Sequence, residues 1–154
     1  MPREHGRVNL LLNRASAWAD VYSHIPYEGR VDLKIRKACP AILVRAPEWI
    51  KSGSPAMMCK VNDAPRAVRW QGRYVNTGHG APGDRVTVTF PIAERTTKET
   101  IGAVPYTLVI KGNTVVSVDP PGKWGALYQR AAYRGNQAPW RTVERFVPDE
   151  QLVW

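Results

Sequence analysis

Polar and apolar residues alternate with a period of two along several short segments of the chain. In residues 31–37, VDLKIRK, the apolar side chains point one way and the charged ones between them point the other. This alternation is typical of a half-buried β-strand. Residues 41–46, AILVRA, predict a second strand that ends at Pro47, and we expect the two strands to be antiparallel neighbours in one sheet.

Turn residues separate the other predicted strands. Gly112-Asn113 joins two β-branched runs, and such a two-residue connection is a strong hairpin signal. Gln71-Gly72 predicts a second hairpin. The predicted strands are residues 8–13, 31–37, 41–46, 58–62, 68–70, 73–76, 85–90, 106–111 and 114–119. Short strands at near-regular spacing predict an all-β fold, an antiparallel β-sandwich of the jelly-roll or immunoglobulin-like type.

The alternating pattern is lost after Pro120-Pro121-Gly122, where aromatic residues are interspersed with arginines. We therefore expect two parts. Residues 1–121 form the β-sandwich domain. Residues 122–154 form an irregular Arg/Trp-rich C-terminal extension that packs on the sandwich or on a partner domain.

Gly78, Gly80 and Gly83 have the Gly-x-Gly-x-x-Gly spacing of a dinucleotide-binding loop. Such a loop follows a strand and opens a helix, whose N–H groups meet the phosphate. Here the glycines lead into residues 85–90, which alternate like a strand. We therefore interpret the segment as a turn that precedes a strand.

The chain carries a formal net charge of +9, from 22 Lys and Arg against 13 Asp and Glu. This charge would attract nucleic acid or acidic polysaccharide. A solvated face, or arginines that pair with another protein surface, is the favoured interpretation, because no nucleic-acid motif accompanies the charge. With no long apolar run and no recognisable signal peptide, we expect no membrane partner and a cytoplasmic location by default.

The sequence offers no arrangement of residues that predicts an active site. Cys39 and Cys59 have no second cysteine or histidine at ligand spacing, so we expect two buried free thiols, although a disulfide between them stays open. No serine lies in a Gly-x-Ser-x-Gly elbow. We therefore assign no catalytic residue, no metal ligand and no cofactor to this chain.

The aromatic residues are the remaining candidates for a binding site. Trp49, Trp70 and Tyr74 lie at strand ends or next to a hairpin and could contact carbohydrate by stacking on sugar rings. Packing in the sandwich core or between domains is the favoured alternative for each of them.

Several segments in order resemble the non-catalytic β-sandwich region of family-127 glycoside hydrolases, the β-L-arabinofuranosidase type. Arg45, Pro47 and Trp49 match its Arg-x-Pro-x-Trp strand end. Val61-Asn62 matches its Val-Asn-Gly turn, with Asp63 in place of the glycine. Gly83-Asp84 with Val86 matches its Gly-Asp-x-Val strand. The resemblance covers about residues 8–121.

The resemblance implies that catalysis is carried out elsewhere. In that family an (α/α) barrel holds a zinc-bound cysteine nucleophile, and neither Cys39 nor Cys59 matches its double-cysteine segment. The chain is thus expected to be a fragment of a distant member. It would act as an accessory β-sandwich, inactive alone, with the barrel as partner and zinc only on that barrel.

Two other functions stay open. The chain could be a free-standing carbohydrate-binding module with a polysaccharide as ligand. It could also be a basic nucleic-acid-binding domain, which is the least favoured of the three interpretations.

Overall fold

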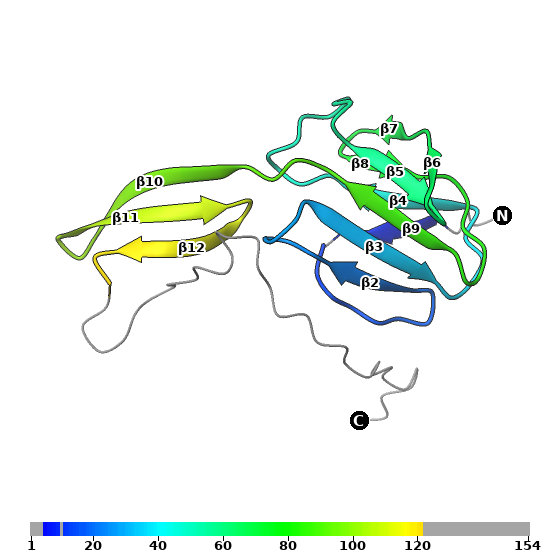
Figure 1. Cartoon of the computed structure of the whole chain (residues 1–154), viewed down its shortest axis with the longest axis horizontal. Coiled ribbons are helices and arrows are strands. Elements are labelled where there is room, and N and C mark those ends of the chain that lie inside the picture. The colour runs from blue at the N-terminus through cyan, green and yellow to red at the C-terminus, as the bar shows by residue number, and fades with distance from the viewer. Residues whose placement is uncertain (1–4, 10, 122–154) are drawn as a thin grey trace, which may run out of the picture. The chain divides into compact units, whose positions relative to one another are not determined.

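The protein is described by a computed structural model that covers residues 5–9 and 11–121. These residues are all strand, turn or loop (Figure 1). They form two compact units, of which residues 5–9, 11–23 and 30–90 make the first and residues 24–29 and 91–121 the second. The all-β fold predicted from the alternation is confirmed.

The first unit is a β-sandwich of two sheets. One sheet has five strands in the order β2 (Ala19–Ser23), β3 (Arg30–Ile35), β9 (Arg85–Thr89), β5 (Met58–Val61) and β6 (Ala64–Arg66). The other has four strands in the order β1 (His5–Val8), β4 (Ala41–Arg45), β8 (Tyr74–Asn76) and β7 (Arg69–Gln71). Every pairing in these sheets is antiparallel except that of β1 with β4, which is parallel.

The core lies between the two sheets and is built from the inward positions of the alternating strands. Val31, Leu33, Val86 and Val88 are fully buried on the five-stranded sheet, and Val44 and Val75 are fully buried on the four-stranded sheet. Each such side chain stabilises the fold by about 1.5–3 kcal/mol through burial. The same alternation places the polar positions of β3, β5 and β9 on the outer face of the five-stranded sheet.

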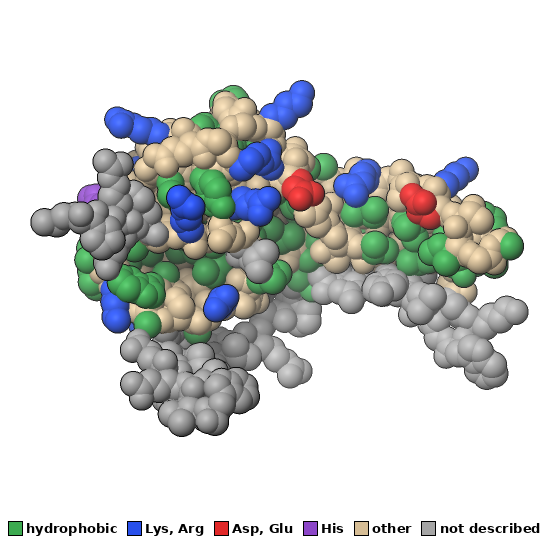
Figure 2. Space-filling model, turned by 180° about the vertical axis from the view of Figure 1, so that it is seen from behind, with side chains coloured by type: hydrophobic (Ala, Val, Ile, Leu, Met, Phe, Trp, Pro, Cys, Tyr) green, Lys and Arg blue, Asp and Glu red, His purple; other side chains and the backbone are tan. Residues whose placement is uncertain are grey.

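The second unit contains a three-stranded antiparallel sheet in the order β10 (Glu94–Ile101), β11 (Val104–Lys111) and β12 (Thr114–Asp119). The predicted Gly112-Asn113 hairpin is confirmed, because Lys111 pairs with Thr114 and Gly112 has a φ of 59°. Figure 2 shows apolar side chains gathered along one side of this sheet.

Two expectations about the strands were wrong. Residues 31–37 and 41–46 do form strands, β3 and β4, but these belong to different sheets, because alternation indicates which face is buried and not which strand lies alongside. The first strand is His5–Val8 and not residues 8–13. Leu12 is 62% exposed, and the Asn13 side chain instead accepts a hydrogen bond from Ser23 N–H over 2.6 Å.

β2, β6 and β10 were not predicted. β10 is polar along almost its whole length and exposed on both faces, so it carries no alternation. The predicted extension over residues 122–154 lies outside the described residues, and the domain boundary after residue 121 stays a prediction.

Candidate functional site

A hollow in the sandwich unit lies over the outer face of the five-stranded sheet. It has a volume of about 940 Å³, within the range of small-ligand sites. Outward-facing residues of β3, β5 and β9 meet residues of β6 and β7 around it. The side chains used in the argument below are Arg30, Asp32, Lys60, Arg66, Trp70 and Arg85.

Ion pairs and hydrogen bonds organise the floor of this hollow. Asp32 accepts a hydrogen bond from Thr87 Oγ1 at 2.6 Å and lies 3.4 Å from Arg30 Nε. Arg85 donates from Nη2 to both carboxylate oxygens of Asp63 at 2.8 Å. Since both acidic groups already have basic partners, they are held as parts of the surface network.

Arg66 at one side of the hollow bonds to neutral groups. Its Nη1 donates to the carbonyl oxygens of His79 at 2.7 Å and Thr77 at 3.2 Å. These two bonds use Nη1 and leave the positive charge of the guanidinium in place. On the inner face beside it, burial raises the pKa of the Cys59 thiol, and the charge of Arg66 opposes that rise.

The glycine-rich segment is a structural turn, as predicted. Gly78 and Gly83 adopt φ values of 84° and 93°, and the segment leads into β9. Asp84 accepts hydrogen bonds from Ala81 N–H and from Asn62 Nδ2, both at 2.8 Å. These bonds, that of Ala81 first, lower the pKa of Asp84. The segment opens no helix, so it lacks the geometry that cradles a phosphate.

The three aromatic candidates lie in three different places. Trp70 is half-buried and lines the hollow. It pairs with inward-facing Val75, whereas Tyr74 is the next residue along β8 and therefore points to the opposite face of that sheet. The Tyr74 hydroxyl bonds to Asn9 Oδ1 over 2.7 Å, with Arg7 over its ring.

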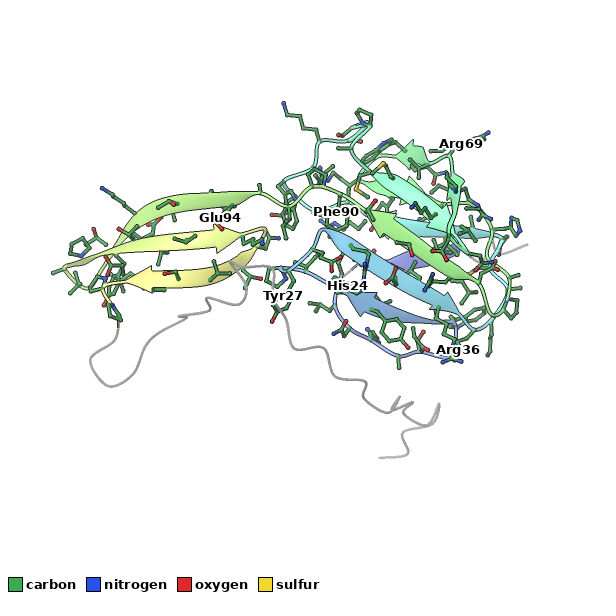
Figure 3. The ribbon with its side chains drawn as sticks, in the orientation of Figure 1. His24, Tyr27, Arg36, Arg69, Phe90 and Glu94 are labelled. Carbon is green, nitrogen blue, oxygen red and sulfur yellow. The ribbon has the colours of Figure 1, made fainter. Side chains whose placement is uncertain are left out.

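Trp49 packs edge-to-face on Phe90 at the end of β9, with ring centroids 6.3 Å apart. Phe90 is labelled in Figure 3. The turn that carries Trp49 is held by Arg73, which donates to the carbonyl oxygens of Pro47, Ile50 and Ala46 at 2.6, 2.8 and 3.2 Å. Trp49 is thus a packing residue, and of the three candidates only Trp70 lines the hollow.

Both cysteines are free and buried, which confirms the expected thiols. Within residues 5–9 and 11–121, no group of three or more His, Cys, Asp or Glu side chains is arranged to hold a metal ion. In the same residues there is no helix long and apolar enough to cross a membrane.

The sequence did not identify Lys60, Arg66 and Thr87 as neighbours. The outward positions of Lys60 and Thr87 follow from the alternation in β5 and β9, whereas Arg66 on β6 is paired with inward-facing Cys59. The proximity of the three depends on β5 pairing with β6 and with β9, and β9 lies far along the chain. The available signal was the charged and hydroxyl residues at every second position of these strands.

No protein-family model matches the sequence, and no curated protein matches it. Among solved structures, the fold is similar to a GH127 β-arabinofuranosidase, with a TM-score of 0.51 and 18% identity. That match covers 75% of this chain and 22% of the other.

Two further solved structures are similar. A GH127 β-L-arabinofuranosidase from Geobacillus stearothermophilus T6 has a TM-score of 0.49 at 16% identity, over 75% of this chain and 20% of its own. A glycoside hydrolase has a TM-score of 0.44 at 18% identity, over 63% and 17%. The chain therefore spans about a fifth of the length of the structures it matches.

At 18% identity, the match with a TM-score of 0.51 shows a similarity of fold. The β-sandwich of this chain is similar to one part of a much longer glycoside hydrolase. This agrees with the family whose strand motifs the sequence resembles.

Proposed function

We propose that this chain is a non-catalytic accessory β-sandwich of a glycoside hydrolase of the β-L-arabinofuranosidase type. It would support an (α/α) barrel encoded outside the present sequence. The observation that carries the proposal is the fold match to a GH127 enzyme, which covers 75% of this chain but only 22% of the enzyme. One domain of a larger enzyme is expected to give such a match, with high coverage of the shorter chain and low coverage of the longer one.

The polar groups of the sandwich support a structural role. Asp32 is engaged by Arg30 and Thr87, Asp63 by Arg85, and Asp84 by a backbone N–H and an amide. A pair of glycosidase carboxylates must instead flank a bound sugar with one acid and one nucleophile or base. These carboxylates are used to fasten strands and turns together.

The test is to assay the purified chain with an aryl β-L-arabinofuranoside, with and without added zinc. A complete family-127 enzyme serves as the positive control. We expect no turnover by this chain. Hydrolysis that persists in the purified chain and follows its elution profile would contradict the proposal.

A second experiment tests the partner. The genomic DNA immediately upstream of Met1 is sequenced, and any helical barrel with a double-cysteine segment encoded there is co-expressed with this chain. We expect the two to co-purify. An upstream region that encodes no such barrel, in a genome without one elsewhere, would count against the accessory role.

A second candidate function is saccharide binding, favoured by the place of Trp70 in the 940 Å³ hollow. Affinity electrophoresis against plant polysaccharides tests it. Trp70→Ala is expected to remove the retardation. Trp49→Ala should leave it, because Trp49 packs on Phe90 and does not line the hollow.

A further inference from the structure

A continuous row of side chains crosses the outer face of the five-stranded sheet. Tyr22 on β2 pairs with Asp32 on β3, and Asp32 pairs with Thr87 on β9. Thr87 in turn pairs with Lys60 on β5, which pairs with Pro65 on β6. Directly paired residues share one face of a sheet. The row therefore forms an uninterrupted surface that a ligand can lie along.

Two hollows share this surface. The larger is the 940 Å³ hollow near Trp70, and the smaller has a volume of about 400 Å³ near Tyr22 and Lys34. Asp32, Asp63 and Arg85 line both of them. The two hollows are thus neighbouring parts of one polar face, with an aromatic side chain at each end.

The face has an excess of positive charge that its own acidic groups do not neutralise. The four basic residues of this face that line the two hollows, Arg30, Lys34, Lys60 and Arg85, outnumber the two acidic ones, Asp32 and Asp63. Both acids are already paired, Asp32 with Arg30 and Asp63 with Arg85. Lys34 and Lys60 are exposed on outward positions of β3 and β5.

Arg66 also lines the larger hollow, but it is paired with inward-facing Cys59 and bonds to carbonyl oxygens, so it lies at the edge of the sheet and not on its outer face. Asp84 lies close enough for the charge of Arg66 to help lower its pKa, yet counting Asp84 still leaves the basic groups in the majority. A ligand that suits this face therefore carries negative charge.

The other groups of the face suit a ligand that also has hydroxyls and an apolar side. Thr87, Thr89 and Ser54 offer hydroxyl groups, and Asp32 and Asp63 offer carboxylate oxygens as acceptors. Trp70 and the exposed Met58, which both line the larger hollow, offer an apolar surface. A sugar acid combines a carboxylate, hydroxyls and a ring with an apolar face. A polyphosphate has few hydroxyl groups to donate to Asp32 and Asp63, and its charges would be repelled by these two carboxylates.

We propose that this outer face binds an anionic saccharide built from hexuronic acid units. A uronate carboxylate lies toward Lys60, the sugar hydroxyls bond to Thr87 and its neighbours, and a ring lies against Trp70. The inference rests on the second candidate function, saccharide binding, and is independent of the accessory role.

The experiment measures binding of the full chain to polygalacturonate by affinity electrophoresis and calorimetry, at about 50 and about 150 mM salt. Neutral arabinan and single-stranded DNA are the comparison ligands. We expect polygalacturonate to bind most tightly, more weakly at the higher salt concentration and still measurably there. Trp70→Ala should weaken it roughly tenfold, as the loss of one stacking contact does, and Trp70→Tyr should retain most of the affinity.

Lys60→Gln should weaken binding by about fivefold, the effect of one exposed charge contact. Lys98→Gln, which makes the same change of net charge on the three-stranded sheet, should leave the affinity unchanged. Thermal unfolding of each variant establishes that it is folded.

Each contrary outcome overturns the inference in a distinguishable way. Equal affinity for arabinan and polygalacturonate, with Lys60→Gln silent, would reject the anionic ligand and keep saccharide binding. Tighter binding of DNA, or an equal loss in Lys60→Gln and Lys98→Gln, would show attraction by net charge alone. Absence of binding to either saccharide would reject both the inference and the second candidate function, and leave the accessory role untouched.

Discussion

Arg73, in the turn between β7 and β8, donates a hydrogen bond from Nη2 to the carbonyl oxygen of Pro47, over 2.6 Å, in the turn that follows β4. The same guanidinium donates to Ile50 at 2.8 Å and to Ala46 at 3.2 Å. A single planar fork thus satisfies three backbone carbonyls of the turn that carries Trp49. The Arg-x-Pro-x-Trp segment is held by a residue that lies outside it.

Arg73→Ala is therefore expected to destabilise the sandwich by about 2 kcal/mol, because carbonyls lose a charged donor. Urea unfolding followed by tryptophan fluorescence measures the effect. Arg69→Ala is the matched control, since Arg69 is exposed on the neighbouring strand β7, as Figure 3 shows, and its removal should cost less than about 0.5 kcal/mol. Equal losses in the two variants would show that Arg73 does not clamp the turn.

Gly80 lies where the two sheets approach each other. A Cβ at this position would lie 2.6 Å from Ile42 Cδ1 and 3.1 Å from Ile35 Cγ1, and both isoleucines are buried. Gly80→Ala is expected to destabilise the protein by about 1–2 kcal/mol through overpacking. Its effect is measured by chemical unfolding.

The double variant Gly80→Ala/Ile42→Val provides the control for this contact. Ile42→Val removes the methyl group that the new Cβ would meet. The double variant should therefore lose less than the sum of the two single losses, with a coupling of at least about 0.5 kcal/mol. If the stability losses of the two single variants simply add up in the double variant, the strain of Gly80→Ala does not come from its contact with Ile42.

Hydrogen bonds from Ala81 N–H and Asn62 lower the pKa of Asp84, which ties its charge to the stability of the glycine-rich turn. In the unfolded chain this carboxylate takes up a proton near pH 4, whereas in the folded state it stays ionised to a lower pH. Its contribution is present above about pH 4 and is lost as the pH falls through the lowered folded pKa. Unfolding at about pH 6 and about pH 3 is compared between the wild type and Asp84→Asn. The difference in unfolding free energy between the wild type and the variant should be smaller at the lower pH. A difference that is the same at both pH values would refute the linkage.

Alternation in the sequence was sufficient to find the central strands, and pairing was not. The inward apolar residues of β3 and β9 recur at every second position, so both strands could be predicted. Placing β3 and β4 in different sheets requires contacts between segments far apart in the chain, and no local pattern encodes them. β10 has no buried face, and a strand without one carries no periodic signal.

The candidate site shows the same limit. Trp70 could be proposed from its residue type, but so could Trp49 and Tyr74. The pairing of β7 with β8 separates Trp70 from Tyr74, and the contact with Phe90 separates Trp49 from both. The residues of the outer face around Lys60 come from three separate segments of the sequence. Proximity across β3, β9 and β5 is what makes them a surface.

Burial raises the pKa of the Cys59 thiol, and this predicts a loss of stability at alkaline pH. The unfolded thiol ionises near pH 8.5, whereas the folded one keeps its proton to a higher pH. Stability is therefore retained below about 8.5 and falls as the pH rises toward the folded pKa. Between about pH 7 and about pH 9.5 the wild type should lose more stability than Cys59→Ala, which has no thiol to titrate. Parallel losses in both proteins would assign the pH effect to other groups.

The conformation of the turn between β5 and β6 explains what the Val-Asn-Gly motif requires at residue 63, where this chain has aspartate in place of glycine. Asn62 and Asp63 have φ values of 49° and 67°, so both adopt the left-handed conformation of a type I′ hairpin turn. Glycine suits that conformation without cost, whereas alanine is disfavoured there by about 1–2 kcal/mol. Asp63 also pairs with Arg85, but an exposed pair of this kind contributes little.

Asp63→Gly and Asp63→Ala remove the same ion pair and differ only in backbone preference, so their comparison isolates the conformation of the turn. We expect Asp63→Gly to be at least as stable as the wild type within about 0.5 kcal/mol, and more stable than Asp63→Ala by about 1 kcal/mol. Urea midpoints of the three proteins measure both differences. If alanine and glycine prove equivalent at this position, the left-handed conformation of residue 63 does not limit the stability of the turn.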